Sequence, residues 1–240
     1  MSGVASFHLV REAPWRAPQV MARMAIDRAR LAGVRGLRFW RVLGTGAGAR
    51  TSFGIDPART AVFAVWEDDD ALTRFLESAP LARRWARTAE RSGECWTTRL
   101  RLLSGHGRWR GADILDGLAP GEPGGPVAVL TRATVRPRAW VRFHGAGAGV
   151  SAAVSAAPGL LAVVAIGEAP LGRQATFSLW TDAAAVRAFA CRDAAHAEVV
   201  RRTRAEDWYG EELFARFAPV ESAGTWDGAD PLAGRGAAGR

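Results

Sequence analysis

The segment RTAVFAVW at residues 59–66 decides the fold, because RQATFSLW at residues 173–180 repeats it. In RQATFSLW polar and apolar side chains alternate with the two-residue period of a β-strand, and both segments end in tryptophan. Each segment is followed by an acidic residue at the start of an expected helix, Asp68 in the first half and Asp182 in the second. Negative charge at this end of a helix interacts favourably with the helix dipole. The chain is therefore expected to contain the same structural unit twice.

The landmarks around this segment recur at matching offsets in the two halves. A strand over SFHLV precedes Pro14 and a strand over VAVLT precedes Pro137, and proline suits the first position of a helix. Gly36 and Gly159 each open a second strand. Each half therefore reads β-α-β-β-α-β, the ferredoxin-like unit, with its second helix broken in two. We predict an α+β fold in which duplicated ferredoxin-like units pair their sheets into a single-chain dimeric α/β barrel.

Composition suggests where these units begin and end. Residues 1–110 form the first ferredoxin-like half, and residues 127–226 form the second, which would carry the functional site. The Gly- and Pro-rich segment 111–126 between them reads as a linker. Residues 227–240 are expected to be a disordered tail.

Charge and cysteine content exclude several classes of protein. The net charge is +8, but the arginines are dispersed along expected helices without a nucleic-acid-binding motif, so no nucleic-acid partner is expected. Cys95 and Cys191 form no CxxC pair, which argues against a disulfide scaffold and a zinc site. The N-terminus lacks the layout of a signal peptide and no run is long enough to span a membrane. We expect a cytoplasmic protein whose charge allows peripheral contact with an anionic membrane or an acidic partner.

Two glycine-rich segments resemble phosphate-binding loops only superficially. GTGAG at residues 44–48 and GAGAG at residues 145–149 do not complete the GxGxxG pattern of a nucleotide-binding βαβ unit. The first is better explained as a turn after a strand, and the second as a site of close packing.

The segment CRDAAHAEVVRR at residues 191–202 contains the most informative histidine. His196 lies early in an expected helix, beside apolar side chains, where a histidine is usually a hydrogen-bonded part of the core. The first half has Leu81 or Ala82 at the corresponding place, so the unit itself does not require a polar residue there. From the residues alone, a structural and a functional role for His196 both stay open.

Longer motifs resemble the spheroidene monooxygenase family of carotenoid biosynthesis. The resemblance implies a haem b enzyme that uses dioxygen and ferredoxin-supplied electrons to place a hydroxyl and then a keto group on an apolar polyene such as spheroidene. The motifs are GLRFWRVLGTGAG (36–48), GRW (107–109), GPVAVLTRATVRPRAWVRF (125–143), GEAPLGRQATFSLW (167–180), FACRDAAHAEVVRRTRAEDWYGEELFARF (189–217) and GTWDGADPL (224–232).

The resemblance also suggests site residues. Haem monooxygenases built on this unit carry an iron-ligating histidine on the helix after the third strand, and His196 occupies that place in a similar context. Phe177 and Phe189 are then expected to contact the haem. Gln174 is a candidate for orienting dioxygen or substrate, or it satisfies the barrel interior. Arg132 is a candidate anchor for a haem propionate through paired hydrogen bonds, or it faces water.

The other histidines are weaker candidates, and two other functions stay open. His8 is expected to be buried and hydrogen-bonded, His106 to lie in a loop, and His144 to end a helix at a place where the family has an aromatic residue. One alternative function is a cofactor-free oxygenase or isomerase with His196 as general base. The other is a non-enzymatic protein that binds haem or lipid.

Overall fold

Eight strands form one closed antiparallel barrel in the computed structural model, which describes residues 2–46, 54–91, 93–139, 154–168, 173–192, 206 and 208–235. The strands are β1 (Val4–Arg11), β2 (Leu37–Gly46), β3 (Ile55–Trp66), β4 (Glu94–Gly107), β5 (Val127–Val135), β6 (Leu160–Gly167), β7 (Arg173–Trp180) and β8 (Tyr209–Gly224). The helices are η1 (Pro14–Arg16), α1 (Ala17–Ala32), α2 (Asp69–Ser78), α3 (Pro80–Glu90), η2 (Pro137–Ala139) and α5 (Ala183–Arg192).

The strand order is the same in both halves. Around the barrel it reads β1-β3-β2-β6-β7-β5-β8-β4, so each half places its strands in the order fourth, first, third, second. The halves join at two seams, where β2 pairs with β6 and β4 pairs with β8. Gly44 and Gly167, which occupy matching places in the two halves, pair with each other at the first seam. The predicted α+β barrel is confirmed.

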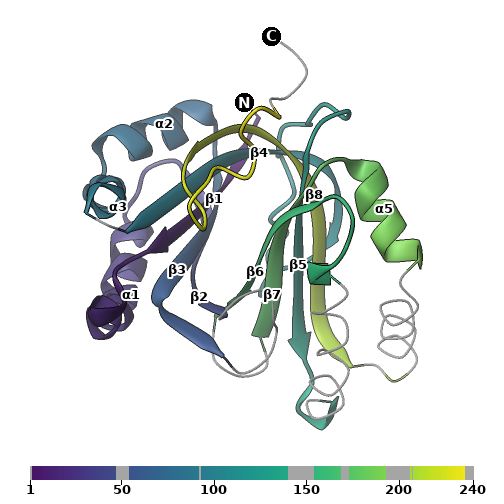
Figure 1. The fold of residues 1–240 in the computed structure, drawn as a ribbon, viewed down its shortest axis with the longest axis horizontal. Coiled ribbons are helices and arrows are strands. Elements are labelled where there is room, and N and C mark those ends of the chain that lie inside the picture. Colours follow the sequence, from purple (N-terminus) through teal and green to yellow (C-terminus); the bar gives the residue numbers. More distant parts are fainter. Residues whose placement is uncertain are drawn as a thin grey trace.

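The helices lie outside the barrel on opposite sides. Figure 1 shows α1, α2 and α3 beside the strands of the first half and α5 beside those of the second. The predicted break in the second helix is confirmed in the first half, where Ala79 separates α2 from α3 and Pro80 begins the new helix. In the second half the corresponding segment lies outside the described residues. No helix in the described part of the chain combines the length and apolar character needed to cross a membrane.

Gly36 and Gly159 play the same structural part in the two halves. Both have positive φ values, +79° and +83°. A Cβ atom on Gly36 would lie 2.5 Å from the Cβ of Ala71, and one on Gly159 would lie 2.6 Å from the Cβ of Ala185. Glycine is therefore required at both places, because the turn needs a left-handed residue and the following helix packs directly against it.

Aromatic side chains from both halves fill the barrel interior. Phe7 of β1 stacks on Phe177 of β7, with ring centroids 3.8 Å apart and planes 8° apart. Phe63 stacks on Trp109 at 5.6 Å. These four side chains are fully buried, so the interior is a packed core that joins the halves.

The segment after β8 ties the two halves together at one end of the barrel. We call residues 225–235 the C-terminal strap. Trp226 and Leu232 of the strap join the barrel core, and Asp230 accepts a hydrogen bond from the indole N–H of Trp96 at 2.9 Å. The strap thus contradicts the expected disorder for residues 227–235, because two apolar anchors and partly buried hydrogen bonds hold it.

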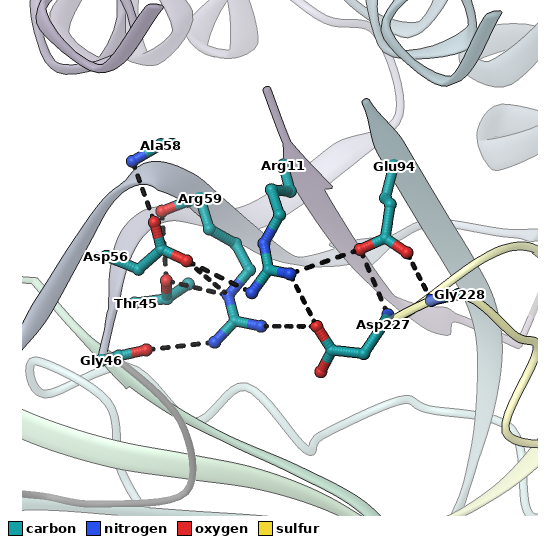
Figure 2. Close-up of polar contacts among 9 residues, drawn as sticks. All are labelled: Arg11, Thr45, Gly46, Asp56, Ala58, Arg59, Glu94, Asp227 and Gly228. Atoms are coloured by element: carbon teal, nitrogen blue, oxygen red, sulfur yellow. Dashed lines mark hydrogen bonds and ion pairs between the residues drawn. The ribbon is translucent and has the colours of Figure 1, made fainter. Parts of the chain in front are cut away.

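Figure 2 shows a cluster of charged side chains that fastens the strap to the first half. The carboxylate of Asp227 lies 2.8 Å from a guanidinium nitrogen of Arg11 and 3.5 Å from one of Arg59. Arg59 is only 3% exposed, and burial followed by the nearby charge of Arg11 lowers its pKa. Asp56 and Glu94 complete the cluster, so both buried or half-buried cations are neutralised.

The expected linker also packs on the barrel. Gly3 forms an isolated bridge with Leu118, and Leu102 forms one with Pro120. Ile114 is 3% exposed and belongs to the barrel core. Residues 111–126 therefore connect the halves as an ordered segment.

We predict that Gly159→Ala lowers the free energy of unfolding by about 2 kcal/mol, because alanine disfavours the left-handed conformation and its Cβ would clash with Ala185. Urea denaturation followed by circular dichroism measures the change. Gly33→Ala is the matched control, since nothing lies within 4 Å of a Cβ at that position. Equal stability of the two variants would contradict the prediction.

Candidate functional site

The outer, helix-facing side of the second half carries small polar side chains in the middle of its sheet. Thr131 of β5 pairs with Thr176 of β7, and both are accessible to solvent. Gln174 lies on the same face of β7, two residues before Thr176, and is half-buried. We call Thr131, Gln174 and Thr176 the polar floor. It matches the polar face of this strand that the sequence alternation predicts.

The first half has the same backbone positions but buries them. Val4 pairs with Trp66 as Val127 pairs with Trp180, and four residues further along each strand His8 corresponds to Thr131. His8 is only 1% exposed, and the rings of Phe75 and Trp85 cover it at centroid distances of 6.3 and 4.8 Å. The two halves therefore differ most on this face, which is filled in one and accessible in the other.

Aromatic side chains border the polar floor on one side. Trp180 ends β7, and its indole N–H donates a hydrogen bond to the hydroxyl of Ser178 at 2.9 Å. Phe189 of α5 packs against Trp180, with ring centroids 5.4 Å apart. Phe189, an expected cofactor contact, thus lies on the same side of the sheet as Gln174.

Arg216 of β8 is a site residue that the sequence analysis missed. It pairs with Val129 of β5 and its guanidinium lies 5.2 Å from the ring centroid of Phe214, which pairs with Thr131. Its Nε is buried, and within the described residues it has no hydrogen-bond partner. An arginine alternating with buried apolar residues in FARF was the available signal, because such a side chain needs an anion near it.

His106 lies on the same side of the sheet. The sequence analysis placed it in a loop, but it belongs to β4, where it pairs with Phe214, and the two rings are 5.9 Å apart. Strand register therefore continues from His106 through Phe214 to Thr131. With adjacent strands about 4.8 Å apart, an exposed imidazole lies about 10 Å from the polar floor. The flanking Gly105 and Gly107 made this strand look like a loop.

Arg132 and Phe177 face the barrel interior, on the opposite side of the sheet from Gln174. The Arg132 guanidinium is 3% exposed and forms an ion pair with Glu211 of β8. Partial burial by itself would raise the pKa of Glu211. Hydrogen bonds from the N–H groups of Gly111 and Arg110, together with the charge of Arg132, outweigh this effect and lower that pKa. These placements are incompatible with Arg132 or Phe177 contacting a cofactor on the polar floor.

The expected axial ligand, His196, lies outside the described residues, as does His144. Among the residues that the structure does describe, no three His, Cys, Asp or Glu side chains gather to hold a metal ion. Burial raises the pKa of the Cys95 thiol to about 12, so this cysteine is no nucleophile at neutral pH. The described part of the site can supply hydrogen bonds, a cation and an apolar border.

His8 is structural, as the sequence analysis expected. Its Nε2 lies 2.8 Å from the hydroxyl of Ser6, which also accepts a hydrogen bond from the indole N–H of Trp66 at 2.9 Å. Burial, and to a smaller extent the charge of Arg99, lowers the pKa of His8 from 6.5 to about 3. The imidazole is therefore neutral in the folded protein at pH 7.

Three relatives that match most of the chain are named spheroidene monooxygenase. The protein from Cereibacter sphaeroides is 31% identical over 219 residues, which cover 89% of this chain and 65% of that relative. The protein from Rhodobacter capsulatus is 32% identical over 224 residues, 91% of this chain and 90% of the relative. The protein from Rubrivivax gelatinosus is 36% identical over 198 residues, 82% and 74% of the two chains. No protein-family model matches the chain.

Solved structures of aldoxime dehydratase share the fold. One has a TM-score of 0.61 at 10% sequence identity, covering 90% of this chain and 81% of that chain. Another, in complex with butyraldoxime, has a TM-score of 0.61 at 8% identity, covering 90% and 79%. Identities this low show the fold alone.

We predict that His8 makes the folded protein less stable in acid. Its pKa is about 3 when folded and about 6.5 when unfolded, so the unfolded state binds more protons between these values. The free energy of unfolding should fall by up to about 1.4 kcal/mol per unit as pH decreases from 6.5 towards 3. Urea denaturation at pH 7, 6 and 5 measures it. His8→Gln keeps a partner for Ser6 without titrating, and an unchanged pH dependence in this variant would refute the assignment.

Proposed function

This chain belongs to the spheroidene monooxygenase family, and we propose from that membership that it is a monooxygenase acting on an apolar polyene of the carotenoid class. It would introduce one oxygen atom from dioxygen, first as a hydroxyl and then as a keto group, and take its electrons from reduced ferredoxin. The names of the three relatives support the substrate class.

The accessible polar floor is the observation that carries this proposal. A duplicated barrel has two equivalent helix-facing sheet faces, and the first is fully occupied by His8, Phe75 and Trp85. On the second face Thr131 stays exposed, although it lies in mid-strand at the place that corresponds to His8. Small side chains on a flat sheet leave room for a planar group, so this face is where we propose that haem b binds.

The described residues around the floor fit a haem group. The buried Nε of Arg216 has no hydrogen-bond partner among the described residues, and its cation suits a propionate carboxylate. Phe189 and Trp180 offer an apolar border on the helix side. Arg216 thus takes the role that the sequence analysis gave to Arg132, whose guanidinium is committed to Glu211 inside the barrel.

Each residue would have a separate task. Haem supplies the activation of dioxygen when it is bound, and the protein supplies placement. We propose that His196 would hold the iron, because a neutral imidazole in apolar surroundings is a good donor to iron. The amide of Gln174 can donate a hydrogen bond across the floor, and the aromatic border keeps water from the reacting groups.

We also infer that the halves are duplicated ferredoxin-like units, spanning residues 1–110 and 127–226. The shared strand order supports this inference, as do the matched glycines Gly36 and Gly159. The helix N-caps match as well. The side chain of Asp68 accepts a hydrogen bond from the N–H of Ala71, and that of Asp182 accepts one from the N–H of Ala185, both at 2.8 Å.

We predict a haem absorption band in protein expressed with added haem, and its loss or shift in His196→Ala because the axial ligand is gone. Visible spectra of the two purified proteins measure this. A wild-type protein that takes up no haem would refute the cofactor and favour the cofactor-free enzyme with His196 as general base. Identical haem spectra would retain the cofactor but exclude His196, and His144 and His106 would be substituted next.

Two variants test the polar floor by titration of the apoprotein with haem. Thr131→Trp should prevent uptake by filling the floor, while the fold tolerates it because Thr131 is exposed. Arg216→Gln should weaken binding about tenfold, since a charge-assisted hydrogen bond is worth about 1.5–3 kcal/mol. Val220→Trp, at a strand position that is 41% exposed, is the matched control and should bind as the wild type does. Normal uptake by Thr131→Trp would place the haem elsewhere.

A further inference from the structure

A groove follows α1 and α3 on the outer side of the first half. Two cavities of about 270 and 320 Å³ share Arg23, Arg84 and Arg87 as lining residues, so they are continuous. A third cavity beside Trp15 shares Glu12 with the first. The groove therefore leads from Trp15 along both helices, on the side of the barrel away from the polar floor (Figure 1).

Arginines dominate the groove. α1 and α3 together contain six arginines and two acidic residues, Asp27 and Glu90. Asp27 is buried and occupied by Arg84, whose guanidinium nitrogens lie 2.7 and 2.6 Å from its carboxylate oxygens. Three further arginines of the groove have no ion-pair partner within the described part of the chain, and these are Arg30, Arg87 and Arg91.

The outward face of α1, next to this groove, is apolar. Ala22, Ala25, Ile26 and Ala29 share one helix face by their spacing, and all four are exposed. Ile26 is 50% exposed, and Trp15, just before the helix, is 74% exposed. Arg23 and Arg30 lie one residue round the helix from this face. We call Trp15 together with these four residues the apolar ridge.

We propose that this side of the first half docks on a lipid surface with anionic headgroups. The three unpaired arginines would bind lipid phosphates, while the apolar ridge would enter the boundary between headgroups and acyl chains. A helix with cations beside a tryptophan-bearing apolar face is the pattern of interfacial membrane helices. The polar floor, on the other side of the barrel, would then face the aqueous phase.

The shape of the surface favours lipid over a protein partner. The apolar side chains stand on the outward face of a helix as a ridge, and the cations lie beside it. A protein partner would need a groove that matches this ridge, whereas a fluid lipid layer adapts to it. Tryptophan is favoured at the headgroup level because its ring is apolar while its N–H remains hydrated.

Vesicle co-sedimentation tests this inference without haem or substrate, so its outcome is independent of the proposed function. We expect the protein to bind phosphatidylglycerol-containing vesicles, to bind phosphatidylcholine vesicles much more weakly, and to dissociate as NaCl increases. The combined substitutions Arg30→Gln, Arg87→Gln and Arg91→Gln should weaken binding on the order of 100-fold, since each cation near an anionic surface contributes about fivefold. Trp15→Ser should weaken it roughly tenfold.

Matched variants separate a specific surface from the net charge of the protein. The combined substitutions Arg35→Gln, Arg74→Gln and Arg235→Gln remove the same charge at exposed positions outside the groove and should bind nearly as the wild type does. Ile55→Ser removes a side chain that is 53% exposed on β3 and is the control for Trp15→Ser. Equal losses in both arginine sets would overturn the proposed surface. So would equal binding to anionic and zwitterionic vesicles, or competition by inorganic phosphate beyond that of NaCl at equal ionic strength.

Discussion

Antiparallel pairing at the two seams is the constraint on which the rest of the structure depends. Each half alone would leave β2 and β4, or β6 and β8, as unpaired edges, and closure uses all four. The seams are unequal among the described residues, where β4 and β8 pair from Trp96–Gly224 to Gly107–Leu213 and β2 and β6 pair at Gly44 and Thr45. Since both sheets turn one face inward, the core is shared and only the helix-facing sides can differ.

That freedom is used differently in the two halves. In the first half, α2 and α3 pack over His8 on the helix-facing side of the sheet, and burial keeps its imidazole neutral. In the second half Thr131 is exposed at the position equivalent to His8, and Thr176 beside it is only partly buried. In a barrel of two similar halves, one half can thus be packed on this side while the other leaves room for a bound group.

The fold could be predicted because its determinants are local and occur twice. The structural effects of Gly36, Gly159 and Pro80 come from the backbone conformations that glycine and proline favour. These effects can therefore be predicted from the residue type alone. It was harder to predict which side chains meet on each face of the sheet. Alternation along a strand shows which side chains share a face, but it does not show which side chains of other strands they contact. Arg132 finds Glu211, 79 residues away, only when β5 and β8 are adjacent. Strand β4 ends in a Gly-His-Gly sequence that resembles a loop, which hid His106.

Composition also gave a wrong prediction for the C-terminal strap, because its small and acidic residues are typical of disordered segments. Two side chains, Trp226 and Leu232, suffice to hold it because a core and two arginines are already in place. Local composition does not contain that information, which belongs to residues more than one hundred positions earlier.

The strap and β8 set the timing of folding during synthesis. β8 is synthesised after β1 to β7, and it supplies the partner for both β4 and β5. Until then Arg11 and Arg59 have Asp56 nearby but lack the carboxylate of Asp227, which lies about 220 and 170 residues downstream of them, and β4 keeps an open edge. The growing chain therefore exposes the strand edges that β8 later pairs, and such edges are prone to aggregation.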